Sequence, residues 1–136
     1  MSAIHVRVLV AGEHYALPVE QILEVAELGD LTPVPGSPPQ IVGVHNLRGQ
    51  VVPVIALATQ LGLAAKEQTR IVVVEIGERR AGLMVDAVLD VGELSPASEQ
   101  VESPYLLGAT LVDGILVGML DLDVVLAPFG HAEAPA

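Results

Sequence analysis

The 136-residue chain has no cysteine, few aromatic residues and few basic residues. The absence of cysteine excludes disulfides, thiol nucleophiles and cysteine-based metal sites. Aromatic residues make up 2% of the chain and hydrophobic residues 51%, so a core must be built from Val, Leu, Ile and Ala. Six Lys and Arg residues against 17 Asp and Glu residues give a net charge of −11, which disfavours binding to nucleic-acid phosphates and to anionic membrane surfaces.

Long apolar runs are also lacking. The apolar runs are about 5–8 residues long, whereas a helix needs roughly 20 residues to span a bilayer. His5 and Arg7 interrupt the short apolar run near the N-terminus, which does not have the pattern of a signal peptide. The length fits one compact domain or two very small ones. We therefore expect a soluble, cytoplasmic protein.

An internal repeat is the clearest pattern that is present. Residues 17–28 read LPVEQILEVAEL and residues 83–94 read LMVDAVLDVGEL, with six identical positions at an offset of 66 residues. Downstream, at an offset of 65 residues, Gly43 matches Gly108 and Gly49 matches Gly114. The spacing predicts two equivalent units within residues 1–130, about 1–65 and about 66–130. Residues 131–136 have no apolar pattern and are expected to be a frayed tail.

Within each unit the pattern is typical of short strands. VRVLVA and RIVVVEI are β-branched runs that end at glycine-containing turns. VVPVIAL is too continuous for a strand wet on one face, which predicts burial on both faces or entry into a closed barrel, and Pro53 within it predicts an edge or a bulge. VEQILEV and VDAVLDV fit either a short helix or a bent strand. We predict an all-β fold of two small β-barrels packed on a shared apolar seam.

Signatures of enzymes and metal sites are absent from the sequence. The acidic pairs Glu20/Glu24 and Asp86/Asp90 could suggest acid–base chemistry. Because the pairs recur in both units, a solvated or partner-facing rim is the better interpretation for Glu20, Asp86 and Asp90. The histidines are far apart and share no ligand spacing: His5, His14, His45 and His131.

Arg48 is one of the few basic residues, and it stands at the start of an apolar run in GVHNLRGQVVPVIAL. A partly buried arginine needs a carboxylate, and Glu24 is the candidate partner in the same unit. The matching positions of the second unit are Asp90 and Asp113, so the fold itself does not require the arginine. Two interpretations stay open: an ion pair that pins a turn, or a polar anchor in an apolar binding groove.

The segment IVGVHNLRGQVVPVIAL, followed by IVVVEIGERRAGLMVDAVLDV, closely resembles the CheW family of chemotaxis adaptors, from about Val6 to Leu126. The resemblance implies one domain of two SH3-like five-stranded β-barrels with pseudo-two-fold symmetry and few short helices. It also implies no enzymatic activity, no cofactor and no metal. The implied role is a scaffold that couples the cytoplasmic tips of methyl-accepting chemoreceptors to the regulatory domain of a CheA-type histidine kinase, at membrane-associated receptor arrays in the cytoplasm.

The resemblance also assigns site residues. The receptor-binding positions that it implies are Val19, Ile22, Glu24, Asn46, Leu47 and Arg48. The kinase-binding positions are expected on the exposed barrel ends, at Gly43, Val44, Ile115 and Leu116.

The chain departs from the family where Ala56 and Ala58 replace the usual Asp and Arg, and this change is expected to weaken a turn or alter partner choice. Two alternatives stay open. One is an interaction module of a non-flagellar pathway, such as twitching, with a different partner. The other is a small enzyme with an undetected site.

Overall fold

The computed structural model describes residues 3–64 and 67–129, so the expected tail at 131–136 and His131 lie outside the described residues. The first half of the chain forms β1 (Ala3–Val10), β2 (Glu13–Pro18), the 3-10 helix η1 (Val19–Gln21), β3 (Ile22–Glu27), β4 (Ile41–Leu47), β5 (Gln50–Ile55) and α1 (Leu57–Gln60). The second half forms β6 (Arg70–Ile76), β7 (Arg79–Val85), β8 (Ala87–Leu94), β9 (Leu106–Val112), β10 (Ile115–Leu120), α2 (Leu122–Leu126) and the 3-10 helix η2 (Ala127–Phe129).

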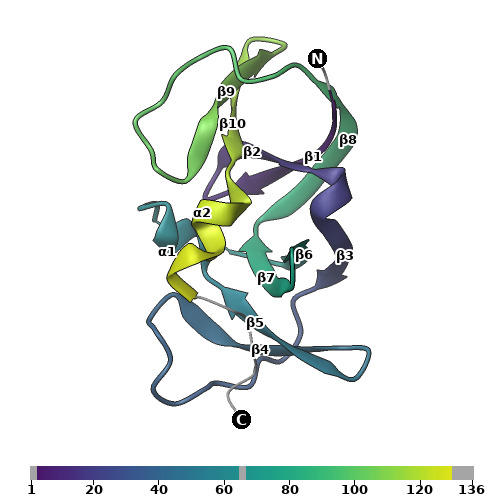
Figure 1. Ribbon diagram of the computed structural model, residues 1–136, viewed down its shortest axis with the longest axis vertical. Coiled ribbons are helices and arrows are strands. Elements are labelled where there is room, and N and C mark those ends of the chain that lie inside the picture. Colours follow the sequence, from purple (N-terminus) through teal and green to yellow (C-terminus); the bar gives the residue numbers. More distant parts are fainter. Residues whose placement is uncertain (1–2, 65–66, 130–136) are drawn as a thin grey trace.

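The strands form two five-stranded sheets, as Figure 1 shows. Sheet A has the order β8-β1-β2-β10-β9, and sheet B has the order β3-β6-β7-β5-β4. Replacing each strand of sheet A by its counterpart in the repeat turns the first order into the second. The two sheets are therefore equivalent in topology, which agrees with the predicted pair of five-stranded units.

The repeats and the sheets do not coincide, however. β1 and β2 belong to the first half of the chain but pair with β8 and β10 of the second half, while β6 and β7 join sheet B. The repeat boundary expected near residue 65 therefore does not separate the two sheets. The exchange interlocks the two halves, so that each sheet is completed by strands of the other half.

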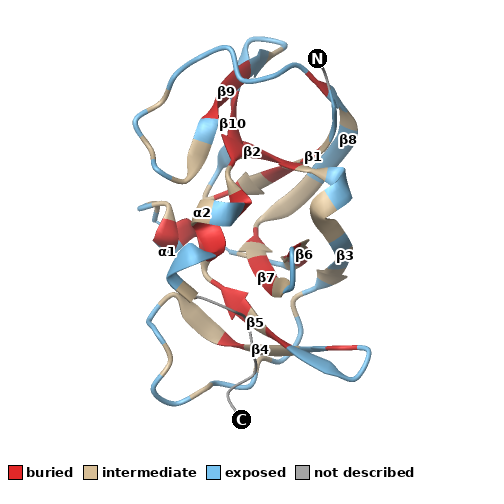
Figure 2. Cartoon of the chain, in the orientation of Figure 1, coloured by how far each residue is buried: buried red, intermediate tan, exposed pale blue. Residues whose placement is uncertain are grey.

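The exchange also explains the apolar run of β6. Val72 and Val74 lie in the central core between the sheets, whereas Ile71 and Val73 lie in a smaller cluster inside sheet B. All four side chains are fully buried, so β6 is buried on both faces. Buried segments from both halves meet in the middle of the molecule, where α1 and α2 also pack (Figure 2).

The run VVPVIAL is only partly buried on both faces, so the prediction for it is corrected. Val54 and Ile55 are fully buried, but Val51 is exposed. β5 pairs with β4 along its length, but with β7 only at Val54 and Ile55. Pro53 lies where β5 has a strand partner on the β4 side alone, which accommodates its missing N–H donor although β5 is not a sheet edge.

Of the two ambiguous segments, VEQILEV divides into η1 and β3, and VDAVLDV enters strand β8 at Ala87.

The predicted equivalence of two glycine turns is confirmed. Arg48–Gly49 connects β4 to β5 and Asp113–Gly114 connects β9 to β10, with positive φ at all four residues. Two-residue hairpins with both central residues at positive φ match the right-handed twist of their strands.

Candidate functional site

The tip of the β4–β5 hairpin contacts strand β3 at the far side of sheet B. Arg48 Nη2 donates to Glu24 Oε1 over 3.3 Å, which confirms the predicted pair. The expected shielding is found on one side only: the Glu24 side chain is 27% exposed, but the Arg48 side chain is 83% exposed. A pair of this kind adds under about 1 kcal/mol to stability, so it is a weak structural pin and leaves the guanidinium open to a partner.

A hollow of about 270 Å³ lies beneath this hairpin tip. It combines two apolar side chains with four polar or charged ones, contributed by β3, the hairpin and β7. Its lining residues are Leu23, Glu24, Leu47, Arg48, Gln50 and Arg80. Three of the predicted receptor-binding residues, Glu24, Leu47 and Arg48, are thereby brought together.

The other predicted receptor-binding residues have different surroundings. Val19 is exposed on η1, and Ile22 is half-buried against the central core, so neither lines the hollow. Asn46 is exposed, and its side-chain oxygen accepts a hydrogen bond from the Gly49 N–H over 2.8 Å, which fixes the turn that carries Arg48. Leu47 is only 7% exposed and packs inside sheet B, so it supports the hairpin from below rather than offering a contact surface.

The residues assigned to kinase binding lie at two ends of the molecule. Val44 belongs to β4 at the lower end of Figure 1, whereas Ile115 and Leu116 belong to β10 at the upper end. Gly43 is buried, and a Cβ at this position would lie 2.9 Å from both Leu31 Cβ and Thr32 O. Its role is to let the connection before β4 pass closely, because Thr32 and Val44 form a β-bridge there.

The upper end exposes more apolar surface than the sequence reasoning assigned to it. Leu111 and Leu116 are direct cross-strand partners, 57% and 50% exposed, and Leu107 on the same strand is also exposed. Leu107 and Leu111 were missed because β9 reads as an ordinary core strand. Alternation along the strand could not have placed them on one face, because Leu107 lies at a bulge of β9 and Ala109, midway between the two leucines, is buried.

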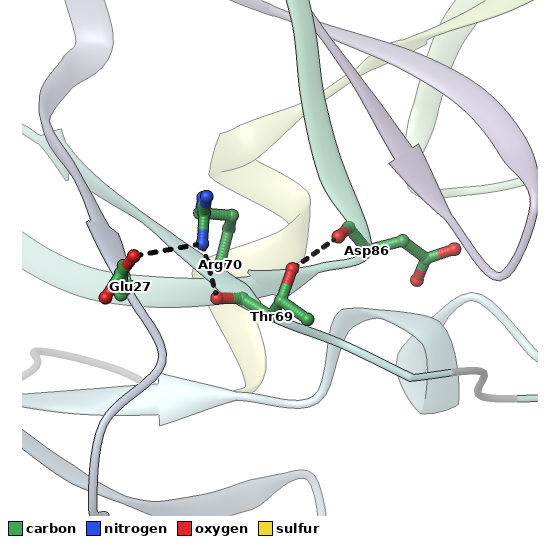
Figure 3. Close-up of polar contacts among 4 residues, drawn as sticks. All are labelled: Glu27, Thr69, Arg70 and Asp86. Atoms are coloured by element: carbon green, nitrogen blue, oxygen red, sulfur yellow. Dashed lines mark hydrogen bonds and ion pairs between the residues drawn. The ribbon is translucent and has the colours of Figure 1, made fainter.

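The acidic residues interpreted as a rim divide into two kinds. Glu20 and Asp90 are exposed, but Asp86 accepts hydrogen bonds from the backbone N–H groups of Ala11 and Gly12, at 3.1 and 2.9 Å. Asp86 therefore fixes the β1–β2 turn, and the rim interpretation is wrong for it. Its backbone carbonyl also accepts from Thr69 Oγ1, next to the Arg70–Glu27 ion pair (Figure 3). These contacts lie where β3, β6 and the β7–β8 junction approach each other.

Asp90, on β8, takes part in a charged group with side chains of the neighbouring strands β1 and β2 of sheet A. Arg7 lies 3.6 Å from Asp90 Oδ2, and its Nη2 is 3.2 Å from His14 Nδ1. Burial, with a smaller effect from Glu13, raises the pKa of the Tyr15 phenol above its usual value.

Among residues 3–64 and 67–129, no three His, Cys, Asp or Glu side chains are grouped so that they could hold a metal ion. Within the same residues, no helix has the length and apolar character needed to cross a membrane.

Comparisons with known proteins agree with this geometry. The family model described as "CheW-like domain" matches residues 5–128. The Chemotaxis protein CheW of Thermotoga maritima is 35% identical over 121 residues, covering 82% of this chain and 79% of the relative. The Chemotaxis protein CheW of Rhizobium meliloti is 29% identical over 136 residues, covering 92% and 87%. The crystal structure of scaffolding protein TtCheW from Thermoanaerobacter tengcongensis superposes with a TM-score of 0.80 at 29% identity, covering 91% of this chain and 92% of that one.

Proposed function

The chain belongs to the CheW family of chemotaxis scaffold proteins, and from this premise we propose that it couples chemoreceptors to a CheA-type histidine kinase through two separate surfaces. The observation that carries the proposal is the extent of the family match, residues 5–128, which includes strands of both sheets. Scaffold proteins of this family are not enzymes. The function therefore depends on which surfaces bind which partners.

The first proposed surface is the hollow under the β4–β5 hairpin, which receives the helical tip of a methyl-accepting chemoreceptor. Arg48 and Glu24 supply polar contacts, with exposed Val19 and half-buried Ile22 extending the apolar part along η1 and β3. Arginine is one of the residue types enriched among the binding hot spots of protein interfaces. Polar groups on the receptor helices would complete the hydrogen bonds that Arg48 leaves open.

The second proposed surface is the β9–β10 end of sheet A, which binds the regulatory domain of the kinase. Ile115 and Leu116 are exposed there, and Leu111 extends the apolar area. An apolar surface of this kind suits a protein partner with a complementary apolar face. Since the two surfaces lie on different sheets, both partners can bind together. We place the protein in the cytoplasm, recruited to membrane-associated receptor arrays.

Two titrations test the proposal. The full chain is titrated with a helical-hairpin tip fragment of a chemoreceptor and, separately, with the isolated kinase regulatory domain. We expect Arg48→Glu to weaken receptor-tip binding about tenfold or more, since a buried or hot-spot charge contact is worth 2 kcal/mol or more, while kinase binding changes little.

The possible outcomes distinguish the surfaces. Equal losses for both partners would mean that Arg48 is structural. Undiminished receptor binding would place the receptor surface elsewhere on the molecule, and failure of the parent chain to bind either fragment would overturn the proposal. In that case, capture of a different kinase or receptor-like protein would point to a non-flagellar pathway.

A further inference from the structure

The tip of the β4–β5 hairpin is tethered by side chains on both of its flanks. One tether is the Arg48–Glu24 pair to β3. The other is a hydrogen bond from Arg80 Nη1 on β7 to Gln50 Oε1, the first residue after the turn. The two tethers thus reach the hairpin from different strands, β3 and β7, and the side chains of both line the first hollow.

The second tether spans a gap in the sheet. β5 pairs with β7 only through Val54 and Ile55, and closer to the turn its ladder partner among the described residues is β4 alone. A second hollow of about 510 Å³ lies in this gap, lined by Gln50, Val51, Val52, Glu75, Gly77, Glu78 and Arg80. The hairpin tip therefore lacks backbone support on this flank, and the Arg80 side chain crosses the space.

Arg80 is itself held in place. Its Nε donates to Glu75 Oε2 over 2.6 Å, and Glu75 is its direct cross-strand partner on β6. The Arg80 side chain is 37% exposed, so the pair is partly screened from water. A planar guanidinium fixed by one carboxylate loses little further freedom when it donates a second hydrogen bond. Glu75 thus orients Arg80 toward Gln50.

The equivalent hairpin of sheet A forms without this tether. At the repeat offsets, Gln50 corresponds to Ile115, Arg80 to His14 and Glu75 to Leu9. Ile115 has no side-chain hydrogen-bonding atom, and His14 contacts Arg7 instead. Both hairpins nevertheless close with the same two-residue turn. Formation of the hairpin does not need the tether, so the Gln50–Arg80 contact calls for another role.

We propose that Arg80 is a positioning residue: acting through Gln50, it holds the hairpin so that Arg48 is presented to the receptor tip. This inference rests on the proposed receptor role of Arg48. Without the tether, the tip samples more orientations, and binding must then order it. Holding a contact residue in its bound geometry beforehand improves affinity by reducing that ordering cost.

Variants of the full chain at Arg80, Gln50 and Arg79 test the proposal, together with Arg80→Met in an Arg48→Ala background. Arg80→Met and Gln50→Met keep most of the side-chain length but remove the hydrogen bond from either end, and the double variant removes both groups. Arg79→Met is the matched control, because Arg79 is the neighbouring residue and also has one carboxylate partner, Asp123 at 3.2 Å, away from the hairpin. Each variant is titrated with the chemoreceptor tip fragment and with the kinase regulatory domain.

We expect Arg80→Met and Gln50→Met each to weaken tip binding about three- to tenfold, as the loss of one exposed hydrogen bond implies. The double variant should lose no more than either single variant, because both remove the same contact. In an Arg48→Ala background, Arg80→Met should have no further effect on tip binding. Kinase binding and the tip affinity of Arg79→Met should stay within about twofold of the parent.

A second measurement does not depend on any partner. Amide hydrogen exchange at Arg48 and Gly49 should be faster in Arg80→Met and Gln50→Met than in the parent. If the parent binds the tip, the role of Arg80 is overturned by either of two results for these variants: amide exchange as slow as in the parent, or tip affinity equal to that of the parent. Equal losses for tip and kinase would make the contact merely structural. A parent chain that binds no receptor tip would instead overturn the proposed function.

Discussion

Arg48 and Asp113 have the same backbone conformation, with φ of 50°, at equivalent positions of the two hairpins. Aspartate and asparagine are favoured at such positions, because their short polar side chains tolerate the left-handed region, whereas arginine has no such advantage. A non-glycine residue held there costs on the order of 1–3 kcal/mol. The weak Glu24 pair offsets this cost only in part. Arginine at position 48 is therefore better explained by recognition than by stability.

This reasoning predicts that Arg48→Asn will fold at least as stably as the parent while losing receptor-tip affinity. The Asn–Gly pair suits the turn, and the lost ion pair is exposed, so we expect the free energy of unfolding to rise by up to about 1 kcal/mol. Urea denaturation measures the change, with Asp113→Asn as the control at the equivalent turn. A loss of stability beyond about 1 kcal/mol would show that the ion pair, not the turn, dominates at this position.

At Gly43, in contrast to Arg48, we predict that a substitution lowers the stability of the fold. A Cβ there would meet Leu31 Cβ and Thr32 O at 2.9 Å, and the backbone oxygen cannot move away as a flexible side-chain end could. We expect Gly43→Ala to destabilise the fold by about 1–3 kcal/mol through overpacking. Gly29→Ala is the matched control, since a Cβ at Gly29 meets nothing within 4 Å. If both variants melt alike, the close approach of the connection is not what fixes glycine at position 43.

How far the sequence could predict this molecule depends on the range of the interactions. The repeat, the short strands and the glycine turns are local patterns, and all three appear in the structure. The exchange of β1 and β2 between the sheets is not local, because several strands have similar apolar patterns and any of them could pair. Gly43 matched Gly108 in the repeat, but its close packing depends on Leu31 and Thr32, which precede it in an irregular connection.

The candidate site likewise combines a contact that the sequence could predict with contacts that depend on the folded arrangement of distant segments. The Glu24–Arg48 contact could be predicted, because the scarcity of arginine and the comparison of the two repeats both singled it out. Its exposure could not, since a turn projects from the sheet whatever the apolar content of its strands. Arg80 and Gln50 are 30 positions apart, without a shared motif or matching residues in the second repeat. Only the folded arrangement of β5 and β7 brings them together.

The start of α1 gives a prediction about the departure at Ala56. In α2 the equivalent residue, Asp121, accepts a hydrogen bond from the Val124 N–H, whereas Ala56 provides no side-chain cap for α1. We expect Ala56→Asp to raise the free energy of unfolding by about 0.5–1 kcal/mol, because it supplies the missing N-cap. Asp121→Ala should lower it by a similar amount. Thermal melts of the two variants measure both stability changes. If Ala56→Asp is less stable than the parent, the start of α1 has no room for a side-chain cap.

The last prediction concerns the apolar end of sheet A. Leu116 and its cross-strand partner Leu111 are both about half exposed, so a charge introduced there meets water in the free chain and disturbs the fold little. In a complex the same charge would be buried against the kinase without a partner. We expect Leu116→Asp to weaken binding of the kinase regulatory domain at least about tenfold. The control is Val51→Asp, which alters the equivalent position of the β4–β5 hairpin and should weaken kinase binding less than about threefold. Calorimetric titration of both variants with the kinase regulatory domain measures the two changes in affinity. A larger loss of affinity from Val51→Asp would place the kinase surface on sheet B. Equally small losses from both variants would exclude both hairpins as the kinase surface.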